Sequence, residues 1–162
     1  MVEIIIAPFM QSYPLKMRHV QTAAMVVTAR AMGGRVADVE FMDGGSKAHI
    51  GFPQDENESG KILATWLSGD LAVRRVDPSS PLSPMVRETL MALTQDMEPD
   101  ERESTIQAVC SETLNALNGR WKAVAKLAEE LEVHQSTRGQ ARLSGKRIDG
   151  VISQVDDDEA GE

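Results

Sequence analysis

The sequence has few aromatic residues, since only 4% of its 162 residues are Phe, Trp or Tyr. Its core must therefore be built from aliphatic side chains, and these are plentiful, because 41% of the chain is hydrophobic and nine residues are methionine. That content is too apolar for an intrinsically disordered protein. A chain of this length buries a core without disulfides or metals. We therefore expect one domain over residues 1–155, with helices favoured over a β-sandwich.

Cysteine is almost absent, because Cys110 is the only one. A single cysteine excludes an intramolecular disulfide and a cysteine cluster around a metal. It falls on the apolar stripe of a helical pattern, so we expect a buried structural thiol. Long hydrophobic runs are also missing. The apolar segment at residues 2–8 is too short to span a membrane and lacks the basic flank of a signal peptide. We therefore expect a cytoplasmic protein without membrane association.

Positive charge is scarce, and the formal net charge is −8. Binding to a nucleic-acid backbone requires a basic face. The basic segments, Arg74-Arg75 and residues 138–147, are short and diluted by other residues, so we expect no nucleic-acid binding. A strongly acidic protein can instead occupy a basic groove on a partner protein.

The pattern of apolar residues predicts a mainly helical α+β fold. A short strand at residues 2–7 precedes a helix at residues 15–32, which Gly33-Gly34 ends. Asp43-Gly44-Gly45 is typical of a tight turn and predicts a hairpin. Its two strands are expected at residues 36–42 and 46–52. Five further helices are expected at residues 61–75, 85–97, 100–117, 121–133 and 146–154.

The remaining segments lack such periodicity. Residues 77–84 contain three prolines and predict an irregular connection. Residues 134–142 predict a polar loop. Residues 156–162 contain no basic or large apolar side chain, so we expect a disordered acidic tail there.

The predicted first helix carries a distinctive pattern over residues 21–34. An Ala/Val run is followed by Arg30-Ala31-Met32 and paired glycines. This segment resembles the active-site helix of FtsH-type zinc metallopeptidases. In that family two histidines, four residues apart on one helix face, bind zinc, and a glutamate beside the first polarises the zinc-bound water. Here the corresponding positions are Gln21, Thr22 and Met25. An amide, a hydroxyl and a thioether do not perform those roles.

The resemblance covers roughly residues 15–154. The segment Leu67-Ser68-Gly69-Asp70-Leu71-Ala72-Val73 is similar to a second family motif, with Val73 where an acidic residue is expected. The third zinc ligand of the family is an Asp, and residues 78–95 contain none; Ser83-Pro84-Met85 stands in its place. Residues 121–131 and Leu143-Ser144-Gly145 are similar to the closing helix and turn. The resemblance implies a helical metallopeptidase-like domain with a small hairpin or sheet, holding no metal and no cofactor.

Three hypotheses about function follow. The first is a non-catalytic pseudo-metallopeptidase that binds a protein partner through the edge of strand 46–52, lined by Lys47, Ala48, His49 and Ile50. The second is an acidic inhibitor or decoy that fills a basic groove on a partner. The third is an enzyme with an unrecognised site that uses His19 or His49. Whether His134 also contributes to a non-standard site is left open by the sequence. Ala- and Met-rich helices with an unburied apolar face would also favour a homodimer. An ordinary buried helix would contain the same residues as the degenerate motif, and that reading also predicts no zinc.

Overall fold

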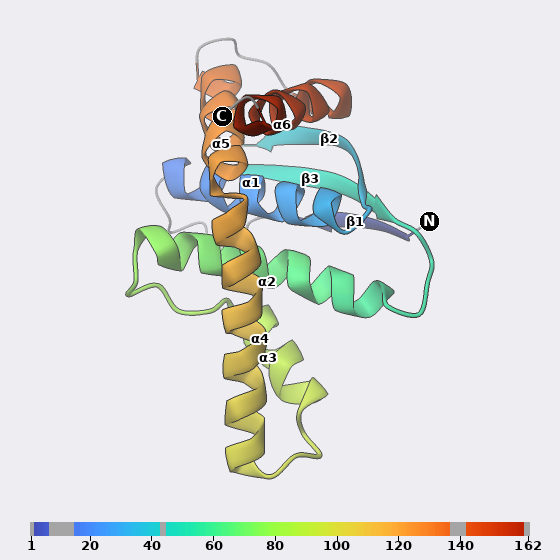
Figure 1. Ribbon diagram of the computed structural model, residues 1–162, viewed down its shortest axis with the longest axis vertical. Coiled ribbons are helices and arrows are strands. Elements are labelled where there is room, and N and C mark those ends of the chain that lie inside the picture. The colour runs from blue at the N-terminus through green and yellow to red at the C-terminus, as the bar shows by residue number, and fades with distance from the viewer. Residues whose placement is uncertain (1, 7–14, 43–44, 137–141, 161–162) are drawn as a thin grey trace.

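The computed structural model describes residues 2–6, 15–42, 45–136 and 142–160, and these residues form a mainly helical α+β fold (Figure 1). From the N-terminus the elements are β1 (Val2–Ile6), α1 (Leu15–Ala31), β2 (Arg35–Met42), β3 (Gly45–Phe52), α2 (Glu58–Val76), α3 (Pro84–Leu93), α4 (Pro99–Gly119), α5 (Trp121–Ser136), β4 (Arg142–Ser144) and α6 (Gly145–Ala160). The predicted fold class is therefore confirmed. No helix in these ranges is long and apolar enough to cross a bilayer.

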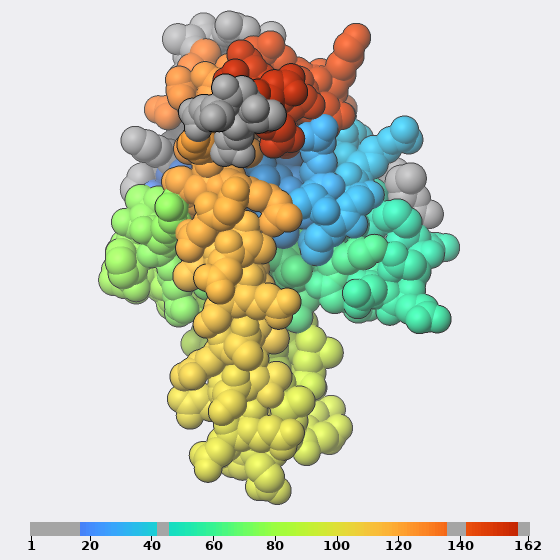
Figure 2. All heavy atoms as spheres, in the orientation of Figure 1, coloured from blue at the N-terminus to red at the C-terminus, as the bar shows by residue number. Residues whose placement is uncertain are grey.

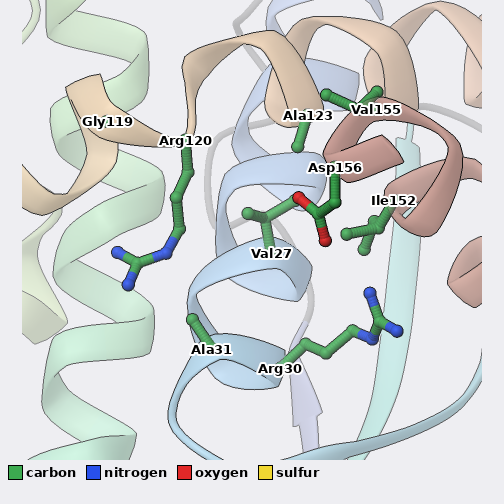
Figure 3. A pocket seen from close by; sticks show the side chains of 9 residues that line it. All are labelled: Val27, Arg30, Ala31, Gly119, Arg120, Ala123, Ile152, Val155 and Asp156. Carbon is green, nitrogen blue, oxygen red and sulfur yellow. The ribbon is translucent and has the colours of Figure 1, made fainter. Parts of the chain in front are cut away.

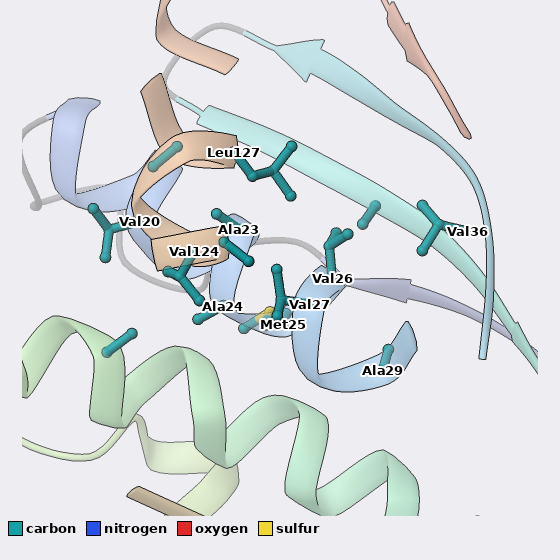
Figure 4. Close-up of a cluster of buried hydrophobic side chains, with 14 of the residues drawn as sticks. Val20, Ala23, Ala24, Met25, Val26, Val27, Ala29, Val36, Val124 and Leu127 are labelled. Carbon is teal, nitrogen blue, oxygen red and sulfur yellow. The ribbon is translucent and has the colours of Figure 1, made fainter. Parts of the chain in front are cut away.

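Helix α1 lies at the centre of the molecule, in contact with β3, α2 and α5 (Figure 4). A helix with neighbours on several sides must be apolar around most of its circumference, and small side chains let those neighbours approach closely. In α1 the side chains of Ala23, Ala24 and Val26 are completely buried. From α5, Val124 and Leu127 complete the same cluster. This central position explains why the first predicted helix is rich in alanine and valine.

The four strands form one antiparallel sheet in the order β1-β3-β2-β4. The predicted hairpin is confirmed by the antiparallel pairing of β2 and β3. Residues 43–44 of the predicted turn lie outside the described ranges. Strand β4 was not predicted, because three residues are too few to show an alternating pattern. In β4, Leu143 is buried opposite Val39 of β2, which anchors the start of α6 to the sheet.

The C-terminal segment differs from the sequence prediction. Instead of ending at residue 154, α6 continues to Ala160, so the expectation of a disordered tail over residues 156–162 was wrong for residues 156–160. Residues 161–162 lie outside the described ranges. The buried side chains of Ile148, Val151 and Ile152 hold the first turns of α6 in place. Once those turns are docked, each added residue is ordered with a hydrogen bond of its own, so even an acidic segment extends the helix.

Two other boundaries also differ. His134 was assigned to a loop, but it lies within α5, is 4% exposed and approaches Glu130, one turn earlier in the helix, at 3.4 Å. Helix α3 ends at Leu93 rather than continuing to residue 97. The hydroxyl of Thr94 donates to the backbone carbonyl of Leu90, which closes the last turn, and Pro99 begins a new helix.

Helices α3 and α4 extend away from the rest of the molecule (Figures 1 and 2). We call residues 84–110, which comprise α3, the following turn and the first half of α4, the helical arm. In α4 only Leu117, beyond the arm, is fully buried, and α3 buries only Val86 and Leu90. The arm is therefore held to the body by few buried side chains and presents most of its surface to solvent.

Candidate functional site

The residues that the resemblance aligns with the zinc ligands of metallopeptidases lie close together in the fold. Gln21 and Met25 on α1 face Asp70 on α2 and the Ser83–Met85 segment at the start of α3. The amide Nε2 of Gln21 donates to Oδ1 of Asp70 over 3.2 Å, and the backbone N–H of Ser83 donates to Oδ2 over 2.7 Å. The side chains of Gln21, Asp70 and Ser83 are at most 5% exposed. We call Gln21, Met25, Asp70 and Ser83 the buried polar cluster.

The space at the buried polar cluster is very small. The cavity lined by these residues, Trp66 and Met85 has a volume of about 10 Å³. A cavity of that size holds at most about one water molecule. A peptide or a metabolite therefore has no room there, and the cluster connects α1, α2 and α3 instead of forming a substrate pocket.

Gly69 explains how α1 and α2 approach so closely at this point. A Cβ atom added at Gly69 would lie 2.5 Å from Cε of Met25 and 3.0 Å from Cγ of Gln21. Both distances are too short for non-bonded carbon atoms. Gly69 therefore makes a helix-packing contact with Gln21 and Met25.

Thr22, which the resemblance aligns with a general base, has a structural role in the fold. Its side chain is completely buried, and its Oγ1 accepts a hydrogen bond from the Ser46 hydroxyl at 2.9 Å. This bond joins α1 to β3. A hydroxyl that is buried and hydrogen-bonded in this way has no access to a substrate.

The sequence did not predict that Asp70 belongs to this cluster, because the resemblance places the acidic ligand within residues 78–95. Burial raises the pKa of the Asp70 carboxyl, whereas the hydrogen bonds from Ser83 and Gln21 and the nearby Arg74 act in the opposite direction. A charged residue at the centre of the otherwise apolar stretch Leu67–Val73 was the available signal, since buried carboxylates are rarely left unpaired.

The predicted peptide-binding edge is wrong. Strand β3 lies between β1 and β2, and its residues 48–51 are paired with β1 on one side and with β2 on the other, so this part of the strand cannot receive an added strand. Ala48 and Ile50 point into the core, where each is at most 1% exposed. Lys47 and His49 point to the opposite face, where Lys47 pairs with Glu40 at 3.2 Å and His49 lies 3.5 Å from Asp38.

The three histidines lie on three different elements. His19 is on α1, His49 on β3 and His134 on α5. Within residues 2–6, 15–42, 45–136 and 142–160, no group of three His, Cys, Asp or Glu side chains is placed to hold a metal ion. The proposal of an enzyme centred on these histidines therefore has no convergent site to support it within that part of the chain.

His19 is the most buried of the three, at 1% exposed, and its ring meets Phe41 edge-on with centroids 6.2 Å apart. Burial lowers the pKa of His19 below its ordinary value of 6.5, partly opposed by the side chains of Gln135 and Glu132. The folded protein therefore favours the neutral form of His19 more than the unfolded chain does. Because the unfolded chain binds that proton more readily, His19 stabilises the fold above pH 6.5, and this stability is lost as the pH falls below 6.5.

The substitution His19→Gln is expected to reduce the loss of stability on acidification. At pH 7.5 it should cost about 1–2 kcal/mol through poorer packing, but its Tm should then fall less between pH 7.5 and 5.5 than that of the wild type. Thermal unfolding at both pH values measures this. The matched control is His49→Gln, at the half-buried histidine on β3. An equal fall in Tm for wild type and His19→Gln would contradict the assignment.

Neither the protein-family models nor the curated proteins contain a match to this chain.

Proposed function

We propose that this chain is a non-catalytic relative of the FtsH-type metallopeptidase domain that acts as a protein-binding module. One observation carries the proposal. Gln21, Met25 and the Ser83–Met85 segment correspond to the three zinc-ligand positions in the resemblance, and all of them line one small cavity. Gln21 and Met25 lie on α1, whereas Ser83 and Met85 lie at the start of α3, so the two parts of the resemblance meet in space, which supports the proposal.

The chemistry of the buried polar cluster supports a structural role. Its carboxylate, Asp70, accepts from both Gln21 and Ser83. A metal ligand must be deprotonated, and zinc sites need three or four imidazole, thiolate or carboxylate groups. An amide and a thioether beside one carboxylate do not meet that requirement. We therefore expect no catalysis, and the single cysteine fits action in the cytoplasm.

Placing histidines at Gln21 and Met25 tests whether these two positions are arranged as zinc ligands. The double variant Gln21→His with Met25→His is expected to bind about one zinc ion, because Asp70 lies beside both positions and supplies a third ligand. The wild type should bind no stoichiometric zinc. Metal content after dialysis and a competitive zinc titration measure both, with circular dichroism to confirm folding.

The matched control places two histidines at Gln107 and Ser111, an exposed pair with the same spacing on α4. That pair offers two ligands only, so zinc binding by the core variant should be about tenfold tighter or more. Adding Asp70→Asn to the core variant should remove the advantage. A folded core variant that binds zinc no more tightly than the control would contradict the resemblance.

The helical arm is the surface that best suits a protein partner. Leu93 is 65% exposed and Met91 is 44% exposed, both near the end of α3. Five exposed carboxylates follow within eight residues: Asp96, Glu98, Asp100, Glu101 and Glu103. Apolar side chains rimmed by charge are typical of protein contact surfaces. The partner surface that fits is an apolar patch bordered by lysine or arginine.

The same acidic residues favour the second candidate function, an inhibitor or decoy that fills a basic groove. In that case nucleic acid and this chain would compete for one partner, and high salt would weaken the complex. A partner that binds both at once would exclude the decoy function while leaving the protein-binding module in place.

Variants of the arm test the contact surface. Met91→Ser with Leu93→Ser, and separately Glu101→Lys with Glu103→Lys, are each expected to weaken capture of the partner by about tenfold or more. Glu56→Lys, a charge reversal in an exposed loop of the body, is the control and should bind normally. Quantitative pull-down with cross-linking measures the loss. Equal capture by all variants would show that the arm is not the contact surface.

A further inference from the structure

A second hollow lies on the body of the protein, away from the buried polar cluster. It is formed by the C-terminal end of α1, the junction of α4 and α5, and α6, and has a volume of about 360 Å³ (Figure 3). This size falls at the lower end of the range for small-molecule sites. Val27, Ala123 and Ile152 form its apolar floor, and they come from three different helices, α1, α5 and α6.

Two charged groups border this floor without carboxylate or guanidinium partners of their own. Arg120, at the helix junction, donates from Nη1 to the backbone carbonyl of Ala116 at 3.2 Å, and within the described ranges it forms no ion pair. A guanidinium has five N–H donors, so most of its capacity remains. Asp156 of α6 lies over the floor (Figure 3) and likewise forms no ion pair within those ranges.

A third charge in the pocket, Arg30, is already neutralised. Its Nε lies 3.0 Å from Oδ1 of Asp149 on α6. The hollow therefore presents one available cation, one available anion and an apolar surface between α1, α5 and α6. A ligand that satisfies all three carries a carboxylate, an ammonium group and a short aliphatic chain.

We propose that this hollow binds a free apolar α-amino acid. The ligand carboxylate pairs with the planar guanidinium of Arg120, which matches carboxylate geometry. Its ammonium group pairs with Asp156, and its side chain covers Val27, Ala123 and Ile152. A dianion such as phosphate fits less well, because Asp149 and Asp156 repel it. The proposal is independent of the helical arm and of the resemblance to a peptidase, since it uses none of their residues.

L-leucine is the probe, and three compounds isolate its parts. A ligand of this size should bind with a Kd on the order of a millimolar. Removing the ammonium group (4-methylpentanoate) or the carboxylate (3-methylbutylamine) should weaken binding about three- to tenfold, because both charged groups of the protein are solvent-exposed. L-serine, which lacks the aliphatic chain, should also bind about three- to tenfold more weakly than leucine. Methyl chemical shifts of Val27, Ile152 and Val155 report the titration.

Variants then assign each charge. Arg120→Gln should weaken the binding of leucine about three- to tenfold. The variant should then bind leucine no more tightly than 3-methylbutylamine, which lacks the carboxylate. Asp156→Asn should abolish the preference for leucine over 4-methylpentanoate and strengthen binding of 4-methylpentanoate. Arg87→Gln, on the helical arm, is the control and should bind leucine as the wild type does. The absence of shift changes at roughly 50 mM leucine, far above a millimolar Kd, would overturn the proposal. Binding that is unchanged in both pocket variants would overturn it equally.

Discussion

The substitution Asp70→Leu is expected to lower the free energy of unfolding by about 2–4 kcal/mol at pH 7, because it leaves two buried donors without an acceptor. The N–H of Ser83 and the amide of Gln21 both donate to Asp70 in the folded protein. A leucine side chain also blocks the space through which a water molecule could replace the lost acceptor. Urea unfolding followed by circular dichroism measures the difference.

Asp70→Asn should have a much smaller effect at the same position. An asparagine can accept from the N–H of Ser83 and donate to Oε1 of Gln21, which has no donor among the described residues, once the Gln21 amide turns over. One polar atom of the Gln21 amide then stays unpaired, as its Oε1 does in the wild type, and no charge is buried. We expect the variant to be as stable as the wild type at pH 7.5, or more stable.

The difference in stability between the wild type and Asp70→Asn should change with pH, and the direction of that change follows from the pKa of Asp70. Because burial raises the pKa of Asp70 above its ordinary value of 3.8, the folded protein holds this proton more tightly than the unfolded chain. The resulting stability is present at acidic pH and is lost as the pH rises through the raised pKa. The stability of Asp70→Asn relative to the wild type should therefore increase from pH 4.5 to pH 7.5. A constant or falling difference would show that hydrogen bonds, and not burial, dominate the ionisation of Asp70.

Gly69→Ala is expected to destabilise the fold by about 1–3 kcal/mol, although alanine favours helix over glycine by about 1 kcal/mol. The added methyl group would lie 2.5 Å from Cε of Met25, so α1 and α2 must separate or the Met25 side chain must leave its place. Gly150→Ala on α6 is the matched control. No atom lies within 4 Å of the added Cβ at Gly150, so that substitution should stabilise by roughly 0.5–1 kcal/mol.

A double-mutant cycle identifies the contact responsible. Met25→Ala alone should cost about 2–5 kcal/mol, because it opens a cavity against α2. Combined with Gly69→Ala, the added methyl group occupies part of that cavity, and the total cost should fall below the sum of the two single costs by roughly 0.5–3 kcal/mol. Thermal or urea unfolding of all four proteins gives the coupling. Additive costs would place the strain of Gly69→Ala somewhere other than Met25.

Local patterns predicted most of the secondary structure. Periodic apolar residues located α1, α2, α4 and α5 to within about one turn, and the Asp43-Gly44-Gly45 turn located the β2–β3 hairpin. Such signals are local because backbone geometry and turn chemistry depend on adjacent residues. The incorrect predictions concern segments whose structure depends on contacts with residues far away in the sequence. Strand β4 exists only because β2 lies beside it, and α6 extends through acidic residues only because its first turns are docked.

By itself, the sequence determined that the chain folds around small aliphatic side chains, that Gln21, Thr22 and Met25 lack the chemistry of zinc ligands and a general base, and that no disulfide forms within it. Only the tertiary structure decided that β3 is an inner strand, that Asp70 closes the cluster with Gln21 and Ser83, and that Arg120 and Asp156 border one hollow. The physical reason is distance along the chain. Side-chain chemistry belongs to each residue, whereas strand order, burial and the meeting of charges depend on segments that only folding brings together.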